Sequence, residues 1–246
     1  MEENKITLIK TKDYEEMSQK AGEIIANLIK SKPNAILGLA TGSTPIGLYK
    51  YLIQKNKEKE ISFKDVTTYN LDEYCGIPKN HDQTYYTFMN KNLFDHVDIN
   101  KENVHLPSGE GNFQENCDSY NKLLSTVKID LQLLGIGTNG HIGFNKPGTP
   151  FDSVVHIVQL TENTIKDNSR FFDNDITKVP KEAITMGIKN ILSADTIILV
   201  ANGKNKAEAI KNLIKGKIDP IVPATALRTH KGKVYVIADA EACSLL

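Results

Sequence analysis

Short apolar runs alternate with amphipathic stretches along the whole chain of 246 residues. The stretches place apolar residues every three or four positions, as at Met17, Ala21 and Ile25, which is typical of helices. Because strands that alternate with helices lie parallel, with helices over both faces, we expect an α/β fold with a mostly parallel sheet in three layers. The runs predict strands at 6–9, 35–40, 66–70, 103–106, 131–135, 154–160, 196–201 and 234–238, and the stretches predict helices at 13–29, 44–54, 83–94, 113–127 and 204–214.

The chain has no Ser/Gly/Pro-rich linker, internal repeat or low-complexity tract that would divide it. We therefore expect a single domain over residues 1–246. The segment 161–180 is polar and has no clear strand pattern, so we expect it to form a mobile flap.

Positive and negative charges balance, since 30 Lys and Arg stand against 30 Asp and Glu. No basic block is long enough to predict a nucleic-acid or membrane surface, which leaves small molecules as the expected partners. No apolar stretch approaches the roughly 18 residues of a membrane span, and residues 1–10 are polar where a secretory signal would be apolar. The chain is expected to be cytoplasmic, with its three scattered cysteines as reduced thiols.

Residues 131–153 contain a buried-looking strand followed by a glycine-rich loop. Gly135, Gly137 and Gly140 match G-x-G-x-x-G, with Glu162 about twenty residues on, which suggests a dinucleotide site. That motif needs a helix after its glycines, and a run of glycine, asparagine and proline at 143–150 interrupts any helix here. The loop is instead expected to present His141 and its neighbour Asn139.

Three loops that follow predicted strands are unusually polar or rich in glycine, and loops at the carboxyl ends of parallel strands share one edge of the sheet. The first contains Thr41, Gly42, Ser43 and Thr44, before a helix that starts near Pro45. Hydroxyls and free N–H groups at a helix N-terminus suit a phosphate, and ordinary helix capping is the alternative. The absence of a Gly-Lys-Ser/Thr sequence argues against nucleotide triphosphates.

The second loop contains Asp72 and Glu73, whose side chains are expected to point in different directions. One acid would face a crevice, where it would suit a general base, while the other anchors the loop; two solvated acids are the alternative. The third loop contains Asn139, His141 and Asn145. A histidine exchanges protons near neutral pH and an adjacent amide can select its tautomer, although a lone loop histidine is often incidental.

Arg170 and Lys206 are candidate cations for a phosphate, with surface charges as the alternative interpretation. A phosphate cradle, a carboxylate and a histidine on one sheet edge predict proton transfer on a phosphorylated metabolite.

The motifs LATGSTP, TTYNLDEY, GIGTNGHIGFN, NSRFF and GKNKA, in this order, resemble those of the glucosamine-6-phosphate deaminase family. The resemblance covers nearly the whole chain. It implies a single α/β domain with a Rossmann-like sheet and no metal or organic cofactor. It also implies a cytoplasmic enzyme of amino-sugar catabolism that converts glucosamine 6-phosphate and water to fructose 6-phosphate and ammonia.

By this resemblance, Asp72 takes the C2 proton to form an enolamine and returns it at C1, and His141 with Asn139 opens the sugar ring. The segment 161–180 is the lid. The resemblance assigns phosphate binding to Thr41, Gly42, Ser43, Thr44, Arg170 and Lys206.

Lys146 departs from the family pattern, which has Glu before Pro147. A lysine near His141 disfavours the imidazolium, so the histidine is expected to be a weaker base; a side chain turned to solvent is the alternative. Residues 151–158 contain no Lys or Arg for a second phosphate, so activation by N-acetylglucosamine 6-phosphate is not expected. Monomeric and homo-oligomeric states both remain open.

Two other functions compete with the deaminase. The 6-phosphogluconolactonases share the fold and similar loops but hydrolyse a lactone. A sugar-phosphate sensor without catalysis is the non-enzyme alternative, and Asp72 and His141 argue against it.

Overall fold

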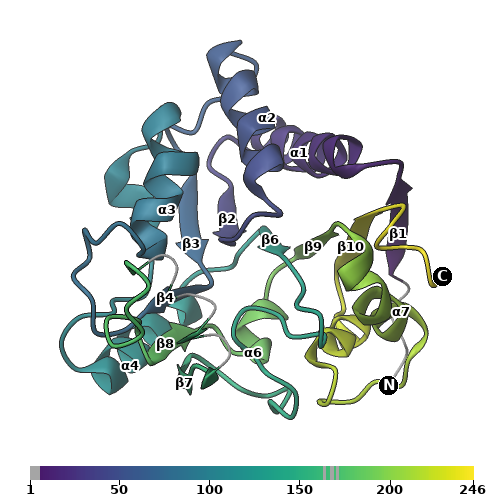
Figure 1. The fold of residues 1–246 in the computed structure, drawn as a ribbon. Coiled ribbons are helices and arrows are strands. Elements are labelled where there is room, and N and C mark those ends of the chain that lie inside the picture. Colours follow the sequence, from purple (N-terminus) through teal and green to yellow (C-terminus); the bar gives the residue numbers. More distant parts are fainter. Residues whose placement is uncertain (1–5, 163–164, 167–168, 170–171) are drawn as a thin grey trace.

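A parallel sheet of seven strands runs through the protein, which a computed structural model describes for residues 6–162, 165–166, 169 and 172–246. The strand order is β1-β10-β9-β6-β2-β3-β5 (Figure 1). Seven of the eight predicted strands lie in this sheet, which confirms the expected α/β class. The strands are β1 (Thr7–Thr11), β2 (Ile36–Leu39), β3 (Thr67–Asn70), β5 (Val104–His105), β6 (Leu131–Leu134), β9 (Thr196–Ala201) and β10 (Lys233–Asp239).

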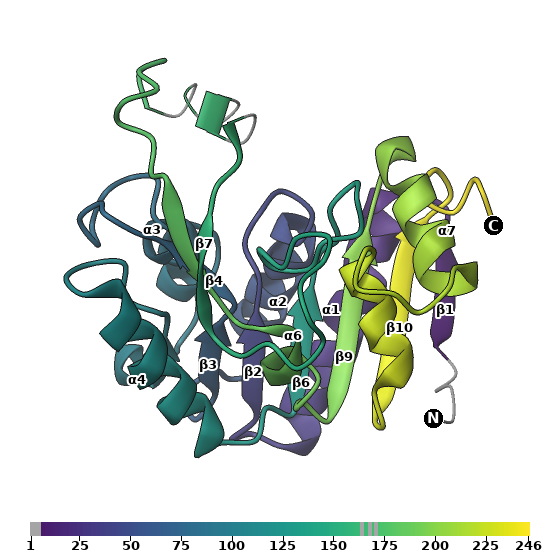
Figure 2. The same cartoon turned by 90° about the horizontal axis from the view of Figure 1, so that it is seen from below.

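Helices cover both faces of the sheet, as Figure 2 shows. Helices α1 (Tyr14–Ser31) and α2 (Ile46–Lys57) lie on one face, with α3 (Tyr85–Asn92) beside α2. The opposite face carries α4 (Phe113–Ser125), α6 (Ile188–Ile191) and α7 (Ala207–Lys215). Short 3-10 helices are η1 (Phe94–His96), η2 (Lys101–Asn103), η4 (Lys204–Lys206) and η5 (Pro223–Thr229).

The apolar positions that predicted the elements form the core. In α1, Met17, Ala21 and Ile25 are fully buried, and the Asp13 carboxylate caps the helix by accepting the N–H of Glu16 at 2.9 Å. The central strands are buried on both faces, as a sheet between two helical layers requires, and all four residues of β6 are excluded from water.

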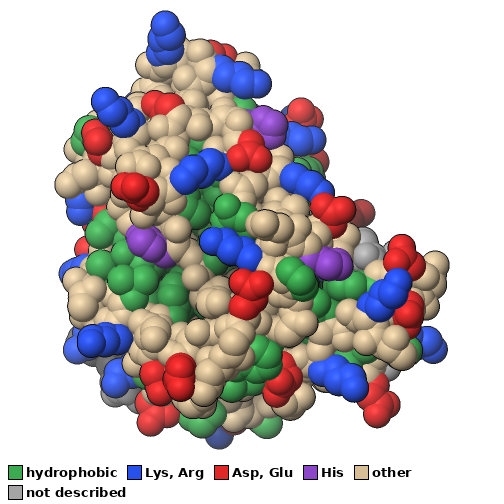
Figure 3. All heavy atoms as spheres, turned by 90° about the vertical axis from the view of Figure 1, so that its left-hand side faces the viewer, with side chains coloured by type: hydrophobic (Ala, Val, Ile, Leu, Met, Phe, Trp, Pro, Cys, Tyr) green, Lys and Arg blue, Asp and Glu red, His purple; other side chains and the backbone are tan. Residues whose placement is uncertain are grey.

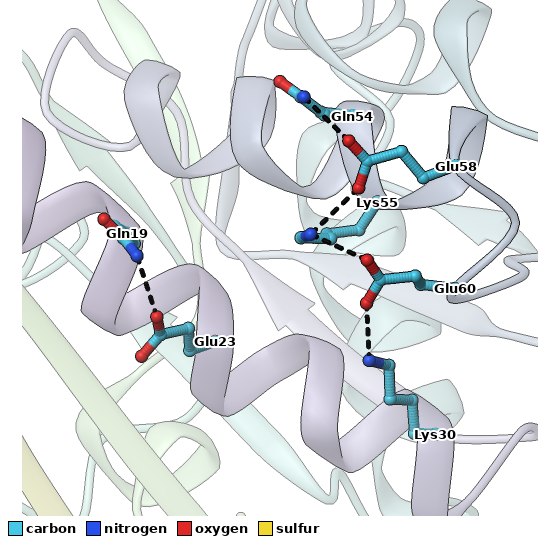
Figure 4. Close-up of polar contacts among 7 residues, drawn as sticks. All are labelled: Gln19, Glu23, Lys30, Gln54, Lys55, Glu58 and Glu60. Atoms are coloured by element: carbon cyan, nitrogen blue, oxygen red, sulfur yellow. Dashed lines mark hydrogen bonds and ion pairs between the residues drawn. The ribbon is translucent and has the colours of Figure 1, made fainter.

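Charged side chains link the ends of α1 and α2 on the protein surface (Figure 4). The Glu60 carboxylate accepts hydrogen bonds from Lys30 and Lys55, each at 2.8 Å, and Lys55 also bonds Glu58 at 2.9 Å. These ion pairs are exposed to solvent, so the buried contacts between the two helices hold them together more than the charges do.

A small antiparallel sheet of three strands stands beside the main sheet, in the order β4-β8-β7. Its strands are β4 (Asp72–Tyr74), β7 (His156–Gln159) and β8 (Glu182–Thr185). Two expectations were wrong here: the strand predicted at 154–160 is not part of the parallel sheet, and Asp72 and Glu73 lie in a strand rather than a loop. A three-residue strand is too short to show periodicity, and its pairing with β8 joins residues more than a hundred positions apart.

The segment 161–180 joins β7 to β8 and contains no strand among its described residues. The Phe172 side chain is buried, and its ring stacks on His81 with 5.3 Å between ring centroids. The expectation of a flap remains a prediction.

The outer face formed by α3 and α4 carries interspersed acidic and basic side chains, and neither sign gathers into a continuous patch there (Figure 3). Among the described helices, none is both long enough and apolar enough to cross a lipid bilayer.

Candidate active site

A cavity of about 390 Å³ opens at the carboxyl edge of the parallel sheet. Loops after β2 and β6 line it, together with the start of β4 and residues from α3 and η4. The three loops predicted from the sequence therefore do converge on one space. The lining residues are 40–45, 71–72, 85, 135–138, 141, 143–144 and 206.

The loop 41–44 leads from β2 into the N-terminus of α2. Among the described residues, no hydroxyl of this loop caps the helix: Pro45 is at the N-cap, and the N–H of Gly47 donates to the Tyr14 hydroxyl at 2.8 Å, so the capping alternative for the loop is wrong. Thr44 donates its hydroxyl to Asn202 Oδ1 at 3.0 Å, whereas no described protein group bonds the hydroxyls of Thr41 and Ser43. Gly42 has a φ of 99°, and, apart from its chain neighbours, no atom of the described residues lies within 4 Å of where its Cβ would be. Open hydroxyls at the positive end of a helix suit an anion.

Lys206 lines the same cavity as this loop, at the end of η4. Burial lowers the pKa of its ammonium group, because the charged form loses hydration. Among the described residues, no carboxylate lies within 4.0 Å of it. The turn before it is held by Asp239, whose two carboxylate oxygens accept the N–H of Gly203 at 3.1 Å each. The cavity therefore contains a cation with no carboxylate partner in the described part of the chain, and a phosphate would supply a counter-ion.

Asp72 begins β4, opposite Thr185 of β8, and its side chain is 6% exposed. Burial raises the pKa of its carboxyl to about 8, and the neighbouring charge of Glu73 adds to the increase. A carboxyl whose pKa lies near neutrality can both take and return a proton at that pH, which suits a general base.

The imidazole of His141 lies directly over the backbone of Gly137, since a Cβ at Gly137 would be 2.0 Å from Cε1 of the ring. Asn139 Oδ1 is 2.7 Å from Nδ1 of His141 and also accepts the backbone N–H of His141 at 3.2 Å. Because an amide oxygen only accepts, Nδ1 must carry the proton and Nε2 is left as the acceptor. Asn139 is itself absent from the cavity lining.

The pKa of His141 is lowered by burial first and by the charge of Lys206 second. Lys146 is not among these causes and does not line the cavity. Its ammonium group instead donates to the backbone carbonyl of Gln159 on β7. The pKa of His141 is therefore lowered, as expected. Lys146, which was predicted to lower it, is not the cause.

Asn145, grouped with His141 in the sequence, is fully buried and does not line the cavity. Its side-chain amide donates to the carbonyls of Ile142 and Met186, both at 2.9 Å, and so ties the loop to the end of β8. Arg170 lies outside the described residues. No group of three or more His, Cys, Asp or Glu among the described residues could hold a metal ion.

Sequence reasoning missed the aromatic wall of the cavity. The rings of Tyr85 and Phe144 are stacked, with centroids 6.2 Å apart and 7° between their planes. The sequence predicts Tyr85 only as a residue of the helix at 83–94, and Phe144 only as part of the motif GIGTNGHIGFN. No local pattern pairs two aromatic residues that are 59 positions apart, so only the tertiary structure could bring them together.

The chain matches the model of the family described as glucosamine-6-phosphate isomerases/6-phosphogluconolactonase over residues 11–236. A glucosamine-6-phosphate deaminase of a Thermoanaerobacter species is 52% identical over 241 residues, which cover 97% of this chain and 94% of the relative. The deaminase of Mycoplasma mycoides is 52% identical over 240 residues, 97% of each chain.

Solved structures agree. A monomeric glucosamine-6-phosphate deaminase superposes with a TM-score of 0.93 at 44% identity, covering 98% of this chain and all of the other. A 6-phosphogluconolactonase from Trypanosoma brucei superposes with a TM-score of 0.78 at 20% identity, covering 99% of each chain. The latter likeness extends to the fold alone.

Proposed function

The chain belongs to the family of glucosamine-6-phosphate isomerases and 6-phosphogluconolactonases, and we propose that it acts as a glucosamine-6-phosphate deaminase. The reaction converts glucosamine 6-phosphate and water to fructose 6-phosphate and ammonia. One observation carries the proposal: a carboxyl, a histidine, the loop before α2 and a lysine with no carboxylate partner among the described residues line one cavity of about 390 Å³. That volume lies within the range typical of small-molecule sites.

The phosphate binds between the loop 41–44 and Lys206. Thr41, Gly42 and Ser43 contribute hydroxyl and N–H groups at the positive end of α2, and Thr44 closes the loop through Asn202. Arg170 contributes a further cation, an assignment that depends on the family motif. Holding the phosphate at one end fixes the reacting carbons at the other, so binding energy is used for orientation.

His141 opens the pyranose ring. With Nδ1–H held by Asn139, the free Nε2 accepts the proton of the anomeric hydroxyl and delivers a proton to the ring oxygen. The lowered pKa of His141 keeps the imidazole neutral at neutral pH, which is the form that can accept.

Asp72 then transfers a proton between neighbouring carbons of the open-chain sugar. Its carboxylate takes the C2 proton, the C1 carbonyl oxygen gains a proton from solvent and becomes a hydroxyl, and an enolamine with a double bond between C1 and C2 is left. The carboxyl returns the proton to C1, which moves the double bond to C2 and nitrogen. Water adds to this imine at C2, the C–N bond breaks, and the nitrogen leaves as ammonia.

The stacked rings of Tyr85 and Phe144 offer an apolar surface to the C–H groups of the sugar. The segment 161–180 is the lid in this proposal, supported by its position between β7 and β8, with β4 alongside. We also expect all of these residues to belong to one domain, which spans residues 1–246.

The lactonase and the sensor are less well supported. The lactonases resemble this chain in fold only, whereas deaminases match about half of its residues. A sensor would have no need of a carboxyl whose pKa burial raises to about 8.

Ammonia release from glucosamine 6-phosphate tests the proposal. The parent should release ammonia and should not hydrolyse 6-phosphogluconolactone, while Asp72→Asn should bind the substrate without releasing ammonia. Binding by the parent without turnover would favour a sensor. Since the related structure is of a monomeric deaminase, we also expect a monomer in light scattering. Because residues 151–158 contain no Lys or Arg for a second phosphate, we expect no activation by N-acetylglucosamine 6-phosphate.

A further inference from the structure

Glu73, next to the proposed base, is a buried acid that the mechanism above does not use. Its side chain is 5% exposed and lines a separate cavity of about 180 Å³, together with Lys79 and Glu110. Asp72 lines the substrate cavity instead, as expected for neighbours in a strand, whose side chains point to opposite sides. A buried carboxylate is costly unless it is well bonded, so its contacts indicate what it is for.

The Glu73 carboxylate accepts three backbone N–H groups. Oε1 accepts those of Tyr74 at 2.8 Å and Tyr85 at 2.9 Å, and Oε2 accepts that of Tyr86 at 2.9 Å. Tyr85 and Tyr86 are the first two residues of α3, whose N–H groups have no partner within the helix. The carboxylate thus clamps the positive end of α3 to β4, one residue from the base.

The clamp has a direct consequence for the substrate cavity, because Tyr85 lines it beside Asp72. Burial raises the pKa of the Tyr85 phenol well above its usual value, and the nearby Tyr74 and Asp72 groups contribute. We propose that Glu73 is a positioning residue for the deamination proposed above: its carboxylate holds the first turn of α3 against β4 and thereby keeps the Tyr85 ring and the Asp72 carboxylate together.

The charge of Glu73 also acts on the base. It is the second cause, after burial, of the raised pKa of Asp72. Burial raises the pKa of Glu73 itself, while its three N–H donors and Lys79 oppose that shift by stabilising the ionised form. The other titratable groups near Asp72 include the Tyr85 and Tyr120 phenols, whose pKa values its charge helps to raise, and His141 and Lys206, which line the same cavity. Substitution of Glu73 leaves the identity of these groups unchanged, while loss of the clamp displaces Tyr85.

Two substitutions separate the clamp from the charge. Glu73→Gln keeps an amide oxygen for two of the N–H groups but removes the charge. Glu73→Asp keeps the charge but is one methylene too short to hold both N–H groups of α3. Glu110→Gln is the matched control, because this exposed acid lines the same cavity of about 180 Å³ and accepts the backbone N–H of Lys79 rather than one of α3.

Steady-state ammonia release is measured for each variant across pH. We expect kcat to fall about tenfold or more in both Glu73 variants, with KM within about twofold of the parent, since small misplacements of reacting groups cost mainly turnover. The acid limb of kcat/KM should move to lower pH in Glu73→Gln only, because Asp72 must be ionised to act. Glu110→Gln should match the parent throughout. A parent-like kcat in Glu73→Asp would overturn the clamp.

Carbon-13 NMR of the Asp72 carboxyl, identified by its loss in Asp72→Asn, provides a readout without turnover. Its titration midpoint should be lower in Glu73→Gln and unchanged in Glu73→Asp and Glu110→Gln. An unchanged midpoint in Glu73→Gln would overturn the inference that the charge of Glu73 helps to raise the pKa of Asp72. If the parent released no ammonia, the proposed function would fail, whereas these titrations would still test Glu73. If Glu73→Gln does not fold, the kcat of Glu73→Asp alone supports or refutes the clamp.

Discussion

Adding one methyl group beneath the catalytic histidine should remove most of the activity while leaving the fold intact. In Gly137→Ala the new Cβ would lie 2.0 Å from Cε1 and 2.1 Å from Nδ1 of His141. Carbon atoms in contact are about 3.5 Å apart or more, so the ring must move by roughly 1.5 Å. The backbone itself does not resist alanine, because Gly137 is not among the glycines with positive φ.

A displacement of that size breaks the 2.7 Å bond between Nδ1 and Asn139 and misaligns Nε2 with the substrate. Misplacement by about 1 Å can reduce a rate about 100-fold. We therefore expect kcat/KM for ammonia release to fall about 100-fold, or ~2.7 kcal/mol in transition-state stabilisation. Because the ring can swing toward the open cavity, stability should fall by only about 1 kcal/mol, the low end for overpacking.

The control is a double-mutant cycle with His141→Ala. Ring opening also proceeds without an enzyme, so this variant should keep a measurable rate. Once the ring is absent, Gly137→Ala should have almost no further effect on kcat/KM, since the two substitutions act through the same contact. The reasoning is refuted if Gly137→Ala stays within about twofold of the parent, or if it costs as much in the His141→Ala background.

Three further outcomes are expected. Lys146→Glu should raise kcat/KM, since the family pattern has Glu at this position, while Lys146→Ala should match the parent, because Lys146 itself bonds Gln159 and is not a cause of the lowered pKa of His141. Equal activity in Lys146→Glu and the parent would contradict this. Asp72→Asn should raise the melting temperature more at pH 8 than at pH 5. The folded state raises the carboxyl pKa from 3.8 to about 8, so between those pH values the folded parent binds more protons than the unfolded chain. The stability of the parent therefore falls as the pH rises through that window, and the variant has no such loss. A difference in melting temperature between Asp72→Asn and the parent that does not depend on pH would argue against a protonated Asp72. Lys206→Ala should raise KM about tenfold or more with little change in kcat, as expected for a charged hydrogen bond to the phosphate; a lower kcat with unchanged KM would assign Lys206 to the chemistry instead.

Much of the cavity was predictable from the sequence for a topological reason. Parallel strands bring their carboxyl ends to one edge, so the polar loops after β2 and β6 had to meet there. It was also expected that the side chains of Asp72 and Glu73 would face opposite sides, because neighbours in an extended segment alternate in direction. The partners of Glu73 were not expected, since they depend on where the N-terminus of α3 comes to lie.

The order of strands and helices, set by local hydrophobic periodicity, thus determined the α/β class, the shared sheet edge and the identity of the polar loops. The tertiary structure alone decided which side chains on those loops touch. It placed β4 and β7 in a separate antiparallel sheet, Gly137 under the ring of His141, Tyr85 against Phe144, and Lys146 on Gln159. The physical reason is that periodicity reports only which face of an element is buried. Contacts between residues far apart in sequence depend on how those faces pack.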